Sequence, residues 1–196
     1  MFHVKHLILQ LPGWLGSGPG HWQSHWEAQC GDQRVQQLDW QQPLRGDWQI
    51  ALQEHMWAQQ ISSQERGDGS VRFVLVGHSL GCHLISAWAH FSPHVEWVAA
   101  AMLVAAPDLS QRDGLPQALR PWSPPVLAPL PFPSLLVSSD DDPYASPEAT
   151  QHMALAWGSQ HQRLSGLGHI NADTGLGNWQ QGRDMLNQLL AGTANA

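Results

Sequence analysis

Apolar runs alternate with stretches of helical periodicity along most of the chain. Most of these runs lack the polar alternation of a half-exposed strand, which is typical of parallel strands covered on both faces. Strands are expected at residues 4–11, 34–38, 71–76, 97–106, 133–138 and 160–164, of which 34–38 is the weakest candidate. This order predicts the α/β class, with a mostly parallel central sheet of about six strands and helices on both faces.

Helical patterns fill the stretches between the runs. Trp22 and Trp26 stand four residues apart, which places both indoles on one face of a helix over residues 21–30. A long helix is expected after an Asp47 N-cap. Its apolar stripe repeats every four residues, at Trp48, Leu52 and Met56. Three more helices are expected at residues 80–92, at 147–157 after a Ser146 cap, and at 178–190.

One stretch, residues 107–133, breaks this rhythm because it is rich in proline. Proline removes backbone donors and disrupts helix interiors, so the stretch cannot be a long helix or a central strand. We interpret it as a long loop and a candidate small lid over a functional site. It is too short for a separate domain, and residues 1–196 are expected to form one domain.

Composition narrows the function classes. The 196 residues include 9 Lys and Arg against 16 Asp and Glu, a formal net charge of −7. No basic stripe is present, which argues against nucleic-acid binding, and anionic membranes would repel the chain. No apolar run reaches the length of a membrane-spanning helix.

The two cysteines, Cys30 and Cys82, cannot form a disulfide framework and show no zinc spacing. The apolar N-terminal run breaks at residues 12–13 without a cleavage site, so we expect a mature cytoplasmic protein. His21 and His25 stand four apart, but no third ligand accompanies them. No metal or cofactor is therefore expected.

The strongest chemical signal is Gly77-His78-Ser79-Leu80-Gly81, which follows the most apolar strand and precedes a helix. It matches G-x-S-x-G, the nucleophile elbow, in which a sharp strand-to-helix turn exposes the serine hydroxyl. The pattern alone is weak, but the flanking strand and helix are the context that it requires. Ser79 is predicted to be a nucleophile, and His78 and Cys82 are interpreted as packing residues.

A serine hydroxyl needs a base, and the base needs an acid that orients it. In this arrangement the chain order is Ser, then Asp or Glu, then His, each after a strand. Three aspartates follow the fifth expected strand, and His169 follows the sixth. We predict His169 as the general base and Asp142, directly before Pro143, as its partner. Asp140 and Asp141 are interpreted as a solvated turn.

Acyl transfer also needs backbone N–H donors for the oxyanion. One is expected from Leu80, directly after the nucleophile, and the other from the turn after the first strand. Trp14 is the predicted second donor, with Leu15 as the alternative. The Trp14 indole would wall an apolar acyl pocket, to which Trp22 or Trp122 could contribute.

A family resemblance rests on four segments of the chain. They are LPGWLGSGPGHWQSHW at residues 11–26, the elbow, Asp141-Asp142-Pro143-Tyr144 and Gly168-His169. Over nearly its whole length the chain resembles the small α/β-hydrolases of the YdeN / retinoblastoma-binding protein 9 family. The resemblance implies a compact α/β-hydrolase fold without the usual first two strands and without a large cap domain. It also implies that Asp142, the aspartate before Pro-Tyr, is the catalytic acid.

Three hypotheses follow. The first is an esterase-like serine hydrolase that cleaves a small ester, thioester or amide through a covalent acyl-enzyme. The second is a hydrolase-fold protein that acts mainly by binding a protein partner, with exposed aromatics and residues 107–133 as its surface. In the third, the same residues transfer the acyl group to an alcohol or amine. Under the first hypothesis the expected partner is a small acyl substrate.

Overall fold

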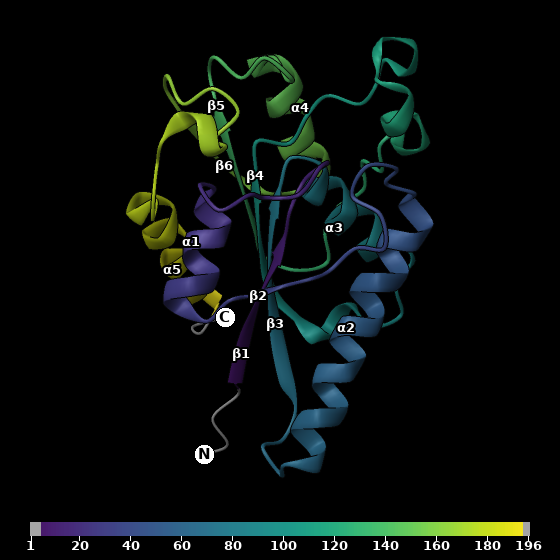
Figure 1. Ribbon diagram of the computed structural model, residues 1–196, viewed down its shortest axis with the longest axis vertical. Helices are drawn as coiled ribbons and strands as arrows, with labels where there is room; N and C mark the ends of the chain where they lie inside the picture. Colours follow the sequence, from purple (N-terminus) through teal and green to yellow (C-terminus); the bar gives the residue numbers. More distant parts are fainter. Residues whose placement is uncertain (1–4, 194–196) are drawn as a thin grey trace.

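The central feature of the fold is one parallel sheet. The structure, a computed structural model, describes residues 5–193; Val4, which the first expected strand includes, lies outside the described residues. The strands are β1 (Lys5–Leu11), β2 (Gln33–Arg34), β3 (Val71–His78), β4 (Val98–Val104), β5 (Ser134–Ser139) and β6 (Gln160–Leu164). Their order is β2-β1-β3-β4-β5-β6, and every neighbouring pair is parallel (Figure 1). The predicted α/β class and parallel sheet are confirmed.

Helices cover both faces of this sheet. They are α1 (Trp22–Cys30), α2 (Arg45–Glu65), α3 (Leu80–Phe91), α4 (Pro147–Trp157) and α5 (Gln180–Thr193). Figure 1 shows α1 and α5 on one side and α2 and α3 on the other. α4 shares the second side, because its buried residues belong to the same core cluster as those of α2 and α3.

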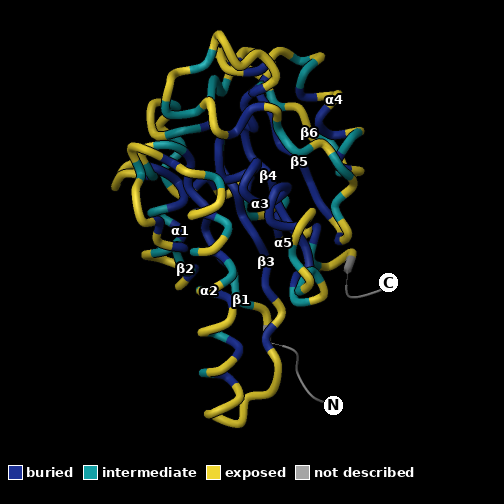
Figure 2. Tube along the Cα trace, turned by 90° about the vertical axis from the view of Figure 1, so that its right-hand side faces the viewer, coloured by how far each residue is buried: buried dark blue, intermediate teal, exposed yellow. Residues whose placement is uncertain are grey.

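The pleat of the strands separates two apolar cores. In β3, Phe73 and Leu75 pack in the cluster with α2 and α3, whereas Val74 and Val76 pack in the cluster with α1 and α5. Alternate side chains of a strand point to opposite faces, so β3 serves both cores. Figure 2 shows the buried centre of the sheet and the exposed far end of α2. Covering on both faces explains why the central strands read as continuous apolar runs.

Two local predictions were wrong. The N-cap of α2 is Leu44, and Asp47 lies in the first turn. There its carboxylate stabilises the helix through the positive end of the helix dipole rather than through a cap hydrogen bond. The second strand is Gln33–Arg34 instead of residues 34–38, because only the end of β1 is available to pair with it.

Residues 107–133 connect β4 to β5 without an α-helix, as predicted. The segment contains only two 3-10 helices, Arg112–Gly114 and Gln117–Trp122. Leu109, Trp122 and Phe132 are buried in the core on the α2 and α3 side. Apolar side chains thus hold the segment against the body of the protein, and between residues 5 and 193 no helical cap domain is inserted. In the same range, no helix has the length and apolar character needed to cross a membrane.

Candidate active site

The strand order creates a crevice at the carboxyl end of the sheet. From β1 the chain moves to the edge strand β2, and from β3 it moves the opposite way to β4. Loops after neighbouring strands that diverge in this way leave space between them, which is where open α/β sheets bind ligands. Ser79 follows β3 and Gly13 lies in the turn after β1, so both lie at this point. The predicted nucleophile is therefore at the topological switch point.

The turn at Ser79 is strained and tightly enclosed. Ser79 has φ 54° and ψ −120°, a conformation that L-residues rarely adopt. Its N–H donates to the Val104 carbonyl over 2.9 Å, which fixes the turn to β4. A Cβ on Gly77 would lie 2.8 Å from the Gly81 carbonyl group, and one on Gly81 would collide with the Leu11 carbonyl oxygen. Both elbow glycines are thus required by close backbone approach.

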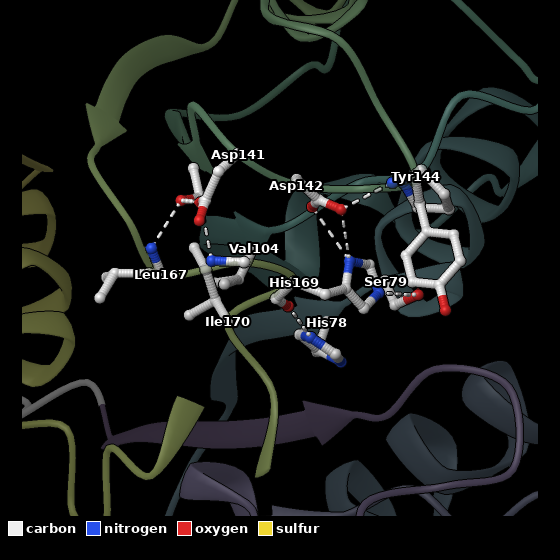
Figure 3. A network of polar contacts seen from close by, with 12 residues as sticks. His78, Ser79, Val104, Asp141, Asp142, Tyr144, Leu167, His169 and Ile170 are labelled. Atoms are coloured by element: carbon white, nitrogen blue, oxygen red, sulfur yellow. Dashed lines mark hydrogen bonds and ion pairs between the residues drawn. The ribbon is translucent and has the colours of Figure 1, made fainter. Parts of the chain in front are cut away.

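Ser79, His169 and Asp142 form a continuous hydrogen-bonded chain (Figure 3). His169 Nε2 lies 2.9 Å from Ser79 Oγ, and His169 Nδ1 lies 3.0 Å from each Asp142 carboxylate oxygen. The Asp142 side chain is 1% exposed and that of His169 is 10% exposed. An ionised carboxylate can only accept, so the ring proton lies on Nδ1 and the Nε2 lone pair faces the serine hydroxyl.

Asp140 and Asp141 lie in an exposed turn, as the sequence interpretation had it, and each also accepts hydrogen bonds from a neighbouring loop. Asp140 Oδ1 accepts from the Gly166 N–H over 3.0 Å, and Asp141 Oδ1 accepts from the Gly168 N–H over 2.8 Å. Hydrogen bonds from the Ser165 hydroxyl and the Gly166 amide lower the pKa of Asp140. Those from Ser139 and Gly168 lower the pKa of Asp141. Both carboxylates thus bind the loop directly before His169 and help to position that residue.

The two predicted oxyanion donors, Leu80 and Trp14, both line the site. Leu80 is the first residue of α3, and the first N–H groups of a helix have no carbonyl partner within it. The Leu15 N–H donates to the Trp40 carbonyl over 3.1 Å. By contrast, the Trp14 N–H has no acceptor among the described residues. Of the two alternatives after β1, only Trp14 thus has a free amide.

A cleft of about 580 Å³ opens above Ser79 and His169. One wall is the turn with Trp14 and Leu15, and the other comes from the start of the 107–133 segment, with Leu109, Leu115 and Leu119. The volume is within the range of small-molecule sites.

Two of the three tryptophans suggested for the pocket do not reach it. Trp22 is buried and donates to the Ile170 carbonyl over 2.8 Å, beside His169. Trp122 is buried and donates to the Pro43 carbonyl over 2.7 Å. Both indoles donate to backbone carbonyls within the core, and the spacing of tryptophans in the sequence does not reveal these acceptors. Only Trp14 lines the cleft.

Two further imidazoles lie beside the catalytic candidate. His78 Nε2 lies 3.0 Å from the His169 carbonyl oxygen, and its ring contacts those of His169 and His21 with centroids 5.0 and 4.6 Å apart. Burial lowers the pKa of His78 well below its ordinary value, and burial, more than the charge of Arg34, lowers the pKa of His21 to about 4. Both rings are neutral at pH 7. His78 packs as expected, but it packs against the backbone of His169.

Cys82 and the pair of His21 and His25 are the other residues that the sequence singled out. Cys82 is fully buried, burial raises the pKa of its thiol, and its Sγ contacts the Gly77 and Val104 carbonyls. His21 Nδ1 accepts from the Gln23 N–H, as the N-cap of α1. Within residues 5–193, no three His, Cys, Asp or Glu side chains are grouped as a metal site would require.

Sequence reasoning missed several residues of the cleft, above all Asp108, Asn171 and Tyr144. The Tyr144 ring stands edge-on to His169, with centroids 4.6 Å apart. Asp108 follows the carboxyl end of β4, as Ser79 follows β3. The strand-end rule that found the other residues could have found Asp108 as well.

Comparison with known proteins agrees with the fold and the serine-containing site described above. A family model described as "Serine hydrolase" matches residues 8–188. No curated protein sequence matches the chain. Among solved structures, it is similar to a YdeN-like hydrolase from Pectobacterium atrosepticum, with 27% identity and a TM-score of 0.79 over 96% of this chain and 92% of that one.

Two more distant structures share the fold. The ydeN gene product of B. subtilis has 17% identity and a TM-score of 0.68, over 96% of this chain and 100% of that one. The esterase domain of a Rhodothermus marinus protein has 16% identity and a TM-score of 0.58, over 95% of this chain and 88% of that one. At these identities the likeness concerns the fold alone. With the family match, these structures confirm the resemblance to YdeN-like α/β-hydrolases.

Proposed function

The chain belongs to the serine hydrolase family, and from this premise we propose that it cleaves small esters, thioesters or amides through a covalent acyl-enzyme on Ser79. The observation that carries the proposal is the hydrogen-bonded chain from Ser79 Oγ through His169 to Asp142, at the floor of an open cleft. Nucleophile, base and orienting acid are in contact where a substrate can reach them.

Acylation uses the lone pair on His169 Nε2. As Ser79 Oγ attacks the substrate carbonyl carbon, its proton passes to Nε2 over the existing 2.9 Å contact. The ring then carries a positive charge, which the two Asp142 oxygens stabilise from the Nδ1 side. Collapse of the tetrahedral intermediate breaks the bond to the leaving group, which takes the proton from Nε2.

The carbonyl oxygen becomes an oxyanion in this step. We assign its stabilisation to the backbone N–H groups of Leu80 and Trp14, the first at the N-terminus of α3. The helix dipole adds a positive potential at the same place. The unusual backbone conformation of Ser79 places it at the N-terminus of α3, with its hydroxyl in contact with His169.

Deacylation repeats the sequence with water. His169 accepts a proton from a water molecule, the resulting hydroxide attacks the acyl carbon, and Ser79 leaves with the proton that Nε2 returns. Apart from substrate and water, these steps use only Ser79, His169, Asp142 and two backbone N–H groups.

The protein contains a second Ser–His pair that serves as an internal control. Ser138 Oγ lies 2.8 Å from His161 Nε2, and His161 Nδ1 lies 3.2 Å from Gln151 Oε1. Its geometry resembles that of the Ser79 pair, but Ser138 is fully buried in β5 and lines no part of the cleft. Contact with a histidine is thus insufficient to make a serine a nucleophile for substrates. Ser79 differs from Ser138 in that an acyl group can reach it through the cleft.

The proposal is tested by intact-mass measurement after exposure to a fluorophosphonate. Wild type is expected to gain one adduct, Ser79→Ala none, and Ser138→Ala one, as in wild type. With 4-nitrophenyl acetate, a stoichiometric burst of 4-nitrophenol should precede the steady state in wild type and Ser138→Ala but not in Ser79→Ala. An adduct that persists in a folded Ser79→Ala variant, or wild type without adduct or turnover, would overturn the proposal. The second outcome would favour the binding-protein hypothesis.

A further inference from the structure

We propose that the cleft selects uncharged acyl groups and excludes acyl groups that carry a carboxylate, and that Asp108 sets this preference. The inference rests on the proposed acyl-enzyme at Ser79 and adds the substrate class. It follows from three properties of the cleft: an apolar wall, a single fixed carboxylate, and no cation to balance it.

The apolar wall comes from two separate segments. Leu109, Leu115 and Leu119 line one side, and Trp14 and Leu15 line the other. Leu109 is almost fully buried, whereas Leu115 and Leu119 are partly exposed to the cleft. Such a surface binds methylene groups by removing them from water. It gives no hydrogen bond or counter-charge to a carboxylate.

Asp108 is the carboxylate at this wall. It is partly exposed and lines the cleft from the loop after β4. Its Oδ1 accepts from the Ser110 N–H over 2.9 Å, and its N–H donates to the Tyr144 carbonyl over 2.8 Å. The residue is therefore held against the turn that carries Asp142, and its side chain is held by the backbone of Ser110. It forms no ion pair with any residue between 5 and 193.

Among the residues that the structure describes, no cation faces Asp108 in the cleft. Arg112 and Arg120 lie in the same segment but do not line the cleft, and Arg120 Nε donates to the Leu115 carbonyl. His21 and His78 line the cleft as neutral rings at pH 7. His83, behind the Pro107 carbonyl, is also neutral, because burial lowers its pKa to about 4.

An anionic acyl group would thus lose hydration and meet a like charge without compensation. In a partly desolvated cleft, both effects act against binding. The charge on His169 that develops in the reaction does not help, because Asp142 already neutralises it. A neutral acyl group of the same shape has neither penalty.

The test uses two esters that differ only in charge, 4-nitrophenyl adipamate and the 4-nitrophenyl monoester of adipic acid. We expect kcat/KM of wild type to be about tenfold or more higher for the neutral ester, 4-nitrophenyl adipamate, than for the anionic ester. This ratio of the two kcat/KM values should shrink as salt rises from 20 to 500 mM. Asp108→Asn should reduce the ratio several-fold by raising kcat/KM for the anionic ester. Ser79→Ala measures spontaneous hydrolysis of each ester.

Asp113→Asn is the matched control, since Asp113 lies in the same segment, is exposed and does not line the cleft. It removes the same charge and should leave the ratio near that of wild type. Equal kcat/KM for the two esters in wild type, or an equal effect of the two Asn variants, would overturn the assignment to Asp108. Because the neutral ester reports Ser79 chemistry alone, its turnover separates failure of this inference from failure of the proposed function.

Discussion

At the scale of single residues, three consecutive aspartates bind three different partners. Asp142 accepts from His169 Nδ1, whereas Asp140 and Asp141 accept from backbone N–H groups of the loop that precedes His169. Asp142 thus orients the ring of His169, whereas Asp140 and Asp141 fix the loop that positions His169.

This division predicts different defects. Asp142→Asn replaces the only carboxylate at His169 Nδ1, so kcat should fall by about a thousandfold to ten-thousandfold while the fold persists. Asp141→Asn keeps an oxygen that can accept from Ser139 and Gly168, so its kcat should fall far less. Steady-state kinetics with 4-nitrophenyl acetate, supported by circular dichroism, decides between them. A larger loss in the Asp141 variant would show that the triad acid was misassigned.

Sequence reasoning reached residues that strand ends and motif order define, and it missed contacts that no motif describes. Ser79, Asp142 and His169 follow strands in a fixed order, so the pattern predicted that they would meet. The partners of Asp140 and Asp141 lie 26 and 27 residues away, and no local pattern encodes them. Trp22 likewise donates across 148 residues to Ile170, which spacing within a helix could not reveal.

At the scale of elements, the junction between β3 and α3 depends on contact with the neighbouring strand. Gly81 in the first turn of α3 faces the Leu11 carbonyl at the end of β1 with no room for a Cβ. This contact brings the Trp14 turn over Ser79. The helix and the strand at this junction were predictable from periodicity. At the start of α2, by contrast, Asp47 was wrongly predicted as the N-cap, because an aspartate at the cap and one in the first turn give the same sequence signal.

The close contact predicts a stability effect. Gly81→Ala should lower the free energy of unfolding by about 3 kcal/mol or more, because the new Cβ must push β1 and α3 apart. Gly46, in the first turn of α2, is the control, since an added Cβ there meets nothing within 4 Å. Gly46→Ala should be neutral or stabilising by up to about 1 kcal/mol. Urea titration of both variants measures the difference, and equal midpoints would contradict the packing argument.

At the scale of the whole molecule, buried histidines link stability to pH. His21 and His83 each have a pKa of about 4 in the folded protein, mainly because of burial. In the unfolded chain a histidine titrates near its ordinary value of about 6.5. Between these values the unfolded chain binds protons that the folded protein does not, so stability falls as pH falls from 6.5 to 4.

The pH dependence can be assigned to single residues. Each such histidine contributes a slope of up to about 1.4 kcal/mol per pH unit in this window. His83→Gln should reduce the slope of unfolding free energy against pH by about one proton, whatever its effect on stability at pH 7.5. Urea unfolding at pH 7.5, 6 and 5 measures it, with the exposed His90→Gln as the substitution control. An unchanged slope in His83→Gln would rule out this residue as a source of the linkage.

The distance of 90 residues between Ser79 and His169 also has a consequence for biosynthesis. Ribosomes add about 5–20 residues per second, so the nucleophile emerges roughly 5–20 seconds before its base. During that interval the elbow lacks its general base, because Asp142 and His169 lie in the loops after β5 and β6, which follow β3 in the chain. A nascent or prematurely terminated chain that lacks His169 is therefore expected not to accept an acyl group on Ser79 from an ester or thioester, and this reactivity appears only after β6 and the loop that follows it have been added.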